Sequence, residues 1–351
     1  MAFALSQPNA RGYTPMISIE VNGREVAAGF YGRLIKATLS DQAGQESDKI
    51  TFDLDDAYNA IIVPPPKATI VVALGYKETG LVPKGTFEMQ PIAFKGEADA
   101  GETLTIQANA ADLKRKLKGK GRESFTGKTL KDIADTIAKR NGMTAHVDPA
   151  IGGFKFDFRS RVDVSEIDFL TTLGDELDAV VKPMGDKLVI SRKGAAASVT
   201  GKALAPILIE KSDCESWEVT PDGRVEYGTV KAAWIDQKTG KRETQEAKTG
   251  LQGPETVLRS PYPSKELAEK AAQAEARRLT RRSGSGNFKL YGRPEAQAEA
   301  DVIAGASFRK EIAGAWRADS VEHAFESAGF TTTVNIAAKE DGSSSKDKEE
   351  D

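Results

Sequence analysis

The sequence is poor in the residues that build metal and nucleophile sites, with one cysteine, Cys214, and two histidines, His146 and His323. A single cysteine excludes an intramolecular disulfide framework and a cysteine-rich zinc site. Neither His-x-Glu nor His-Glu-x-x-His occurs, so zinc-dependent hydrolysis has no basis. The neighbouring Asp213 and Glu215 disfavour the thiolate of Cys214 by like charge. We therefore expect no catalytic residue, no metal site and no cofactor, although 52 acidic residues leave a carboxylate pair open.

Long apolar runs and an excess of either charge are also missing. No run of 18 apolar residues occurs, so we expect no membrane-spanning segment. Residues 1–11 lack the charged and apolar regions of a secretory signal. Lys and Arg total 49 against 52 Asp and Glu, for a net charge of −3, which argues against specific nucleic-acid binding. The 351 residues suggest roughly two or three globular domains.

The first hundred residues show the alternation of apolar and polar side chains that is typical of strands. The clearest stripe covers residues 70–76, and Asn22-Gly23 follows another stripe as a turn signal. Three consecutive prolines at 64–66 interrupt the pattern. The stripes cover residues 17–21, 35–39, 50–54, 70–76, 87–89, 92–94 and 104–108. We expect residues 1–111 to form a tube-like β-barrel domain.

A helical pattern begins near residue 129, where Thr129 and Asp132 have the spacing of a capping box. Asn141-Gly142 is a stop signal for this helix. A second helix is predicted to begin at Ser165, and residues 188–190 form a strand. We expect residues 112–193 to form a small α+β insert.

Strand patterns return after residues 194–201, whose small side chains indicate a linker. Stripes at 217–219, 230–234, 288–290 and 316–336 flank a helix that Ser264 begins and Gly284 ends. We expect residues 194–338 to form a second tube-like β-barrel with one helix, and the acidic residues 339–351 to be disordered. The predicted fold class is mainly β, with two barrels flanking an α+β insert.

Several motifs have a structural interpretation. Gly127-Lys128-Thr129 resembles the end of a phosphate-binding loop, but five residues rather than four separate it from the preceding glycine, so a helix cap is favoured. The cationic run 114–122 is interpreted as a solvated connection or a docking point for an acidic protein. Four arginines near the helix end, Arg277, Arg278, Arg281 and Arg282, suit the helix dipole. We expect a packed His323 and place His146 in a loop.

Three stretches, in order and spread over residues 12–337, resemble a known family. They contain Val21-Asn22-Gly23, Leu39-Ser40-Asp41 and Asp53-Leu54-Asp55-Asp56; then Arg224-Val225-Glu226-Tyr227-Gly228-Thr229-Val230; then Val321-Glu322-His323 and Gly329-Phe330-Thr331-Thr332-Thr333. The combination is similar to the late control protein D family, the baseplate hub proteins of contractile-tailed phages. Residues 294–304 depart from the family, which usually has a glycine-rich turn there.

The resemblance implies a structural hub and no enzyme. It implies a homotrimer with two barrels per chain, so that six barrels form a ring around a central channel. Such a ring joins a six-fold tail tube to a three-fold spike. The implied partners are further copies of the chain, the tail tube, spike and other baseplate proteins, and a tape-measure protein. The implied location is the virion tail baseplate, assembled in the bacterial host cytoplasm. An open strand edge in each barrel would provide the ring contact.

Two other functions stay open. The helices and strand within residues 129–190 can be compared with a peptidoglycan-binding LysM module, which would make the chain a wall-binding tail protein. An enzyme that uses a carboxylate pair is the third alternative. A lumen rich in Lys and Arg would hold DNA, so a hub predicts neutral or acidic lumen positions, with the run 114–122 outside.

Overall fold

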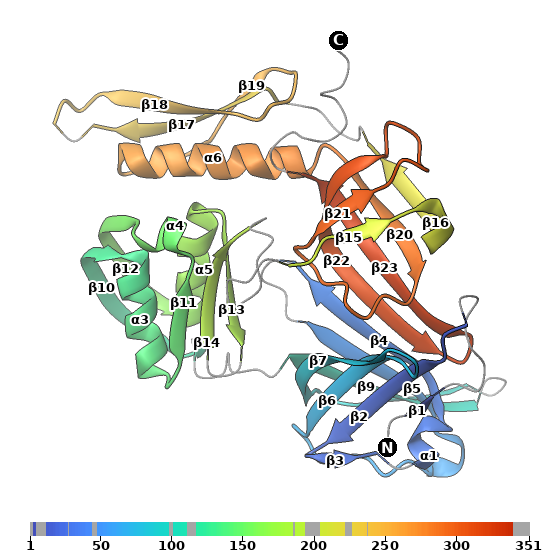
Figure 1. The fold of residues 1–351 in the computed structure, drawn as a ribbon. Helices are drawn as coiled ribbons and strands as arrows, with labels where there is room; N and C mark the ends of the chain where they lie inside the picture. Colours follow the sequence, from blue (N-terminus) through green and yellow to red (C-terminus); the bar gives the residue numbers. More distant parts are fainter. Residues whose placement is uncertain are drawn as a thin grey trace.

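The computed structural model describes residues 3–4, 12–26, 28–43, 48–97, 101–110, 117–184, 187–193, 204–221, 227–236 and 238–339. Strands dominate, which confirms the mainly β fold class (Figure 1). None of the described helices is long and apolar enough to cross a membrane.

The largest unit is a 15-stranded sheet built from both ends of the chain. The N-terminal strands are β1 (Phe3–Ala4), β2 (Pro15–Val21), β3 (Arg24–Glu25), β4 (Leu34–Gln42), β5 (Lys49–Asp55), β6 (Thr69–Tyr76), β7 (Gly80–Met89), β8 (Ala93–Glu97) and β9 (Gly101–Ala110). The C-terminal strands are β15 (Ile207–Ile209), β16 (Cys214–Thr220), β20 (Ser285–Tyr291), β21 (Asp301–Ala304), β22 (Gly314–Glu326) and β23 (Gly329–Ala338). We call this unit the main body.

The predicted stripes correspond to real strands. Alternate residues of β2, β5 and β6 are buried, as period-two patterning requires. Asn22 and Gly23 both have positive φ and join β2 to β3, so the turn signal is confirmed. The short helix α1 (Ala28–Tyr31) and the 3-10 turn η1 (Ala57–Asn59) cover this part of the core, and η2 (Lys211–Asp213) precedes β16.

Residues 117–193 form a separate α+β unit. It contains β10 (Lys120–Thr129), α3 (Leu130–Arg140), β11 (Thr144–Val147), α4 (Pro149–Gly152), β12 (Lys155–Ser165), α5 (Glu166–Glu176), β13 (Ala179–Met184) and β14 (Lys187–Arg192). Thr129 and Asp132 form the predicted capping box, and Ser165 caps α5 by accepting from the Asp168 amide. Three elements that were not predicted from the sequence, β11, α4 and β12, lie between α3 and α5.

A third group packs beside this unit. Helix α6 (Lys265–Arg281) covers a three-stranded sheet of β17 (Thr229–Ile235), β18 (Arg242–Lys248) and β19 (Glu255–Val257). Ser264 begins the helix as predicted, but Arg282, not Gly284, caps its end. Leu267 and Tyr262 also pack into the core of the α+β unit, so the two groups share contacts. We call residues 117–193 and 227–282 together the arm; Figure 1 shows it beside the main body. The division at residues 111, 193 and 338 stays a prediction.

Candidate assembly surface

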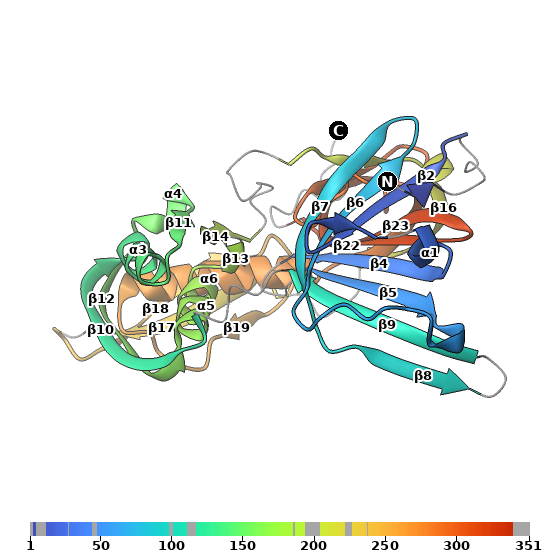
Figure 2. The same ribbon diagram turned by 90° about the horizontal axis from the view of Figure 1, so that it is seen from below.

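The two ends of the chain join along one seam in the main body. Strand β4 pairs antiparallel with β22, from Lys36 opposite Glu326 to Gln42 opposite Ser320. The pairings on either side continue this seam into a path of eight strands, in the order β8-β9-β5-β4-β22-β23-β20-β16. The path contains four strands from each end of the chain, and Figure 2 shows it as one curved sheet.

Both ends of this path are open. Among the described residues, no strand pairs with the outer edge of β8 or with the outer edge of β16. In β8, Phe94 is 64% exposed, and in β16, Trp217 is 42% exposed. Open edges with exposed aromatic side chains recruit further strands unless they are covered. These two edges are therefore the candidate contacts between copies.

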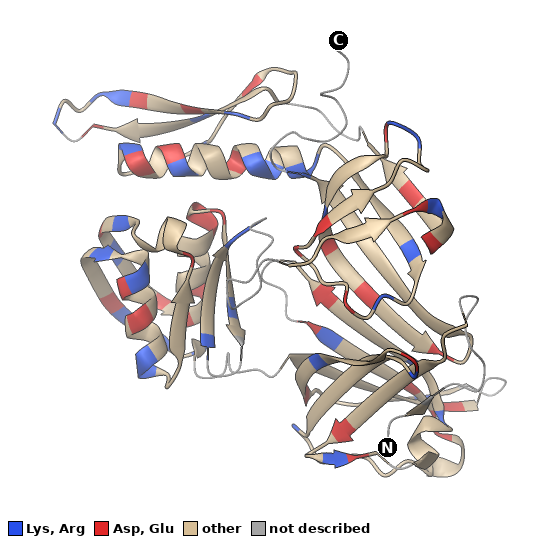
Figure 3. Ribbon diagram, in the orientation of Figure 1, with Lys and Arg blue, Asp and Glu red and all other residues tan. Residues whose placement is uncertain are grey.

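One face of the eight-strand path packs on the apolar cores, and the other is polar. Residues in register along the polar face include Gln107, Thr51 and Thr38, which lie on neighbouring strands. The charged residues with described side chains on this face include Lys36, Lys49, Lys95, Lys289, Arg317, Asp53, Asp55, Glu218, Glu322 and Glu326. Among these, four lysines and one arginine stand against five carboxylates, and Arg317 also forms an ion pair with Asp301 (2.9 Å). Figure 3 shows the same interspersed charge along these strands.

The lysines of the polar face have acidic neighbours. Lys36 lies between Asp53 and Glu326 in register, and Lys289 forms an ion pair with Glu215 (Nζ–Oε2, 2.9 Å). This pair raises the pKa of Lys289. A surface on which lysines and carboxylates are interspersed has no dense cationic site for phosphate.

Buried polar groups hold the seam on its core side. His323 is fully buried in β22, which confirms the prediction that it is packed. Its Nδ1 lies 3.0 Å from Thr332 Oγ1, and its Nε2 lies 2.9 Å from Lys84 Nζ. Lys84 also donates to the carbonyl of Pro294. The same Nε2 lies 3.2 Å from the Ala296 carbonyl oxygen; when Nε2 accepts from the Lys84 ammonium, Nδ1 carries the proton towards Thr332.

Burial sets the protonation of this group. Desolvation, followed by the nearby Lys84 charge, lowers the pKa of His323 well below its usual value, so the imidazole is neutral. Burial also lowers the pKa of Lys84 to about 8, although Asp41 and Glu295 oppose the change. Close by in β4, Asp41 Oδ2 accepts from the Ala298 amide at 2.9 Å. These contacts join β7, β4, β22 and the segment before β21.

The turn of residues 294–300, where the sequence departs from the resembled family, packs against this seam. Ala296, Ala298 and Ala300 are buried, and the carbonyl of Ala296 lies 3.2 Å from His323 Nε2. Because alanine side chains are small, this turn lies close to the sheet.

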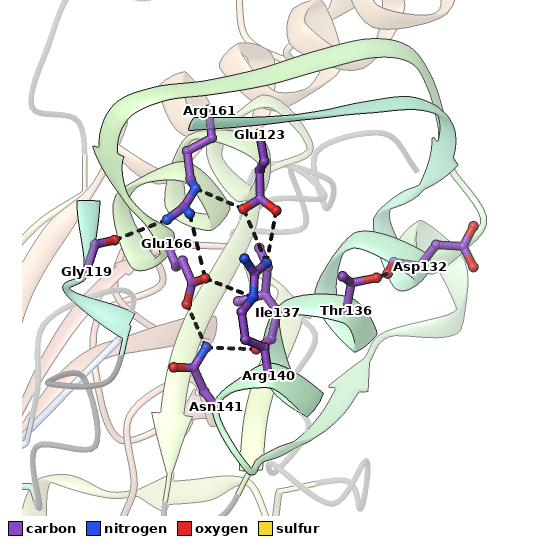
Figure 4. Close-up of polar contacts among 9 residues, drawn as sticks. All are labelled: Gly119, Glu123, Asp132, Thr136, Ile137, Arg140, Asn141, Arg161 and Glu166. Atoms are coloured by element: carbon purple, nitrogen blue, oxygen red, sulfur yellow. Dashed lines mark hydrogen bonds and ion pairs between the residues drawn. The ribbon is translucent and has the colours of Figure 1, made fainter. Parts of the chain in front are cut away.

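The arm contains a second polar group, drawn in Figure 4. Arg161 of β12 contacts Glu123 of β10 (Nε–Oε1, 2.9 Å) and donates to the Gly119 carbonyl (3.1 Å). Arg140, at the end of α3, contacts Glu123 (Nη2–Oε2, 3.0 Å) and Glu166 (Nε–Oε1, 3.2 Å). Asn141 links the other oxygen of Glu166 to the Ile137 carbonyl. Two arginines and two glutamates form ion pairs with each other, so the cluster fastens the β10–β12 ribbon to both helices and is a structural group.

The motifs singled out in the sequence take different places in the structure. Gly127-Lys128-Thr129 ends β10 and caps α3, which confirms the cap interpretation. His146 lies in strand β11 rather than a loop, a correction that follows from its parallel pairing with β14. Arg277 and Arg281 do more than face the helix dipole, because both contact the buried Asp178 at 2.7 and 3.1 Å. Burial, then Asp213, raises the pKa of Cys214 to about 11, so its thiolate is disfavoured as predicted.

Part of the cationic run lies outside the described residues, namely positions 114–116, as does the linker at 194–201. Lys118, Lys120 and Arg122 are exposed on the arm. Of the stretches that carry the resemblance, residues 224–226 are also not described. Within the part of the chain that the structure describes, no group of three or more His, Cys, Asp or Glu residues could hold a metal ion.

Comparison with known proteins agrees with a role in tail assembly. No family model matches the chain. The probable baseplate hub protein of Escherichia phage 186 is 26% identical over 367 residues, which cover 93% of each chain. A 43 kDa tail protein of prophage MuSo2 from Shewanella oneidensis has the same fold, with a TM-score of 0.69 over 93% of this chain and 99% of that chain, at 15% identity. The fold also extends to an E. coli component of the type VI secretion system described as similar to the phage T4 tail proteins gp27 and gp5. Its TM-score is 0.53 over 91% of this chain and 76% of that chain, at 8% identity.

Proposed function

We propose that this chain, a phage baseplate hub protein by homology, acts as a homotrimer that adapts the six-fold tail tube to the three-fold spike. The hub role and the place in the virion tail rest on the homologues, and they confirm the resemblance inferred from sequence. The trimer, its partners, its assembly in the host cytoplasm and the absence of catalysis are parts of the proposal.

The observation that carries the proposal is the eight-strand path with an open edge at each end. Because β8 and β16 are different strands, an edge-to-edge contact between copies is head-to-tail. A closed assembly that is built from such contacts is a ring. Four strands come from each end of the chain, so three copies present six similar segments around the axis. That arrangement meets a six-fold partner on one side and a three-fold partner on the other.

The polar face supports the central channel of the proposal. In a closed ring this face lines the lumen, since the apolar cores occupy the other side. Its mixed charges, with Arg317 paired to Asp301, allow DNA or a tape-measure protein to pass without tight binding. The arm then lies outside the ring, with the exposed Lys118, Lys120 and Arg122 on its surface.

Crosslinking between the two edges tests the ring. In a Cys214→Ser background, which removes the partly buried thiol, Glu218→Cys supplies an exposed thiol on β16 and Lys95→Cys supplies the second on β8. A short bis-maleimide should give covalent dimers and trimers of this K95C protein, with light scattering showing a trimer before crosslinking. The matched control replaces K95C by Lys77→Cys, in the turn between β6 and β7.

Equal crosslinking of K77C and K95C would reject the β8–β16 contact. A monomer by light scattering that sediments with purified peptidoglycan would reject the hub and favour the wall-binding alternative.

A further inference from the structure

The main body and the arm have separate apolar cores. The clusters of the main body are built by strands β2–β9 and by β15, β20–β23 and their loops, and β22 and β23 contribute to both. The clusters of the arm share Tyr262. Among the described residues, no side chain belongs both to a cluster of the main body and to a cluster of the arm. Apolar packing therefore holds each body together without fixing the angle between them.

The arm is internally fastened. Asp178, in the turn between α5 and β13, is 4% exposed and accepts from Arg277 Nε (2.7 Å) and Arg281 Nη2 (3.1 Å) of α6. A buried carboxylate between two arginines resists separation, because either half alone would leave a charge unpaired. The α+β unit and α6 therefore move together.

Helix α6 continues directly into the main body. Only residues 282–284 separate it from β20, and the Gly284 carbonyl accepts from the Ala338 amide at 3.0 Å. A Cβ at Gly284 would lie 2.9 Å from the Trp316 ring, so the chain crosses here at close range. This crossing fixes the arm at one point. A second contact is needed to fix the orientation of the arm relative to the main body.

Lys182 supplies a second contact, on the other side of β22 from that crossing. It lies on β13 of the arm, and its Nζ donates to the Gln42 carbonyl of β4 at 2.7 Å. The same ammonium lies 3.7 Å from Asp48 Oδ1, and Asp48 in turn accepts from the Gln42 amide. Lys182 is 25% exposed and Asp48 29%, so water only partly screens the contact. Burial and Asp41 raise the pKa of Asp48 to about 6, so the carboxylate is ionised at pH 8.

We infer that Lys182 is a positioning residue that fixes the orientation of the arm against the seam strand β4. The contact joins the arm to the strand at which the two ends of the chain meet, so it sets the arm relative to the ring-forming sheet. This inference concerns a single chain and holds whether or not the chain forms a trimer.

Distance measurement between two spin labels tests the inference. Lys77→Cys places one label on the main body and Ser160→Cys places the other on β12 of the arm, in a Cys214→Ser background; positions 77 and 160 are exposed. Labelled protein is diluted with unlabelled protein, so that only distances within one chain are recorded. Measurement at pH 8 keeps Asp48 ionised.

Lys182→Ala should shift or broaden the distance distribution while the melting temperature changes little, and Lys182→Arg should restore the narrow distribution. The matched control is Lys193→Ala, which removes a lysine of similar exposure and its ion pair with Asp175 inside the arm (3.2 Å). It should leave the distribution unchanged. If K182A fails to fold, Asp48→Asn replaces it, with a smaller expected shift because the Gln42 contact stays.

An unchanged distribution in folded K182A would overturn the inference. So would an equal change in K193A, because the effect would then follow from loss of any lysine on the arm.

Discussion

Lys84 of β7 and His323 of β22 meet inside the main body, with Nζ and Nε2 2.9 Å apart. One residue comes from the N-terminal half of the sheet and the other from the C-terminal half. Two basic side chains at this distance require one to accept, which forces His323 to stay neutral. The contacts at the seam therefore depend on the protonation states of Lys84 and His323.

The buried Lys84 makes stability depend on pH. Its pKa is lowered from 10.5 to about 8 by burial, so between these values the unfolded chain binds more protons than the folded chain. The free energy of unfolding should therefore rise with pH across this window, by at most about 3 kcal/mol. Urea unfolding at pH 7.5, 8.5 and 9.5 measures the slope. Lys84→Met, which removes the titrating group, should flatten it; parallel slopes in the two proteins would contradict the assignment.

Loss of His323 should weaken the seam. His323→Ala removes a fully buried ring and one contact each from Lys84 and Thr332, so we expect a loss of about 2–4 kcal/mol. The adjacent Glu322 is exposed on the polar face, and Glu322→Ala should change stability by no more than about 0.5 kcal/mol. Chemical denaturation of both variants checks the difference, and similar losses would show that burial at the seam is not decisive.

Asp178 should couple helix α6 to the α+β unit within the arm. Its φ of +53° is tolerated by asparagine, so Asp178→Asn keeps the backbone and removes only the charge. Because Arg277 is partly solvated, we expect a loss of about 1–3 kcal/mol rather than the full effect for a buried pair. Asp175→Asn, at an exposed carboxylate near the end of α5, is the control. A negligible effect of D178N would mean that α6 is held by its apolar contacts alone.

The polar face should not bind DNA until cations are added. Wild-type protein is expected to show negligible duplex binding in filter assays at ~150 mM salt. Replacing the neighbouring Thr38, Thr51 and Gln107 by lysine creates one cationic row, and binding should then appear and weaken steeply with salt. Wild-type affinity in the micromolar range that is lost on replacing Lys114, Arg115, Lys116 and Lys118 by alanine would instead locate a DNA site in the cationic run.

The acidic C-terminus should be dispensable for folding. Lys339 forms an ion pair with Asp301 (3.5 Å), while residues 340–351 lie outside the described chain. Truncation after Lys339 should therefore change the free energy of unfolding by less than about 0.5 kcal/mol. A truncation after Ala338 serves as comparison and should cost slightly more. A large fall in melting temperature for the chain that ends at Lys339 would assign the tail a structural contact.

Local signals predicted local structure well and long-range structure poorly. The stripe at 70–76 was sufficient to predict a strand, and the caps at Thr129, Ser165 and Ser264 were sufficient to predict where helices begin. These signals lie within a few residues of the elements that they predict. The β4–β22 pairing was not predictable, since nearly three hundred residues separate strands whose patterns match many partners. Strand β12 was missed because Arg161 is buried only through ion pairs that a hydropathy pattern does not record. That the two halves superpose as similar barrels stays a prediction.

The seam also dictates an order of events during synthesis. Strand β4 is complete once Gln42 has been made, but its partner residues in β22 extend to Glu326. Until the ribosome has added nearly the whole chain, one edge of β4 lacks its neighbour, and the sheet cannot be completed. A nascent or prematurely ended polypeptide that lacks β22 therefore cannot form the continuous sheet of the main body.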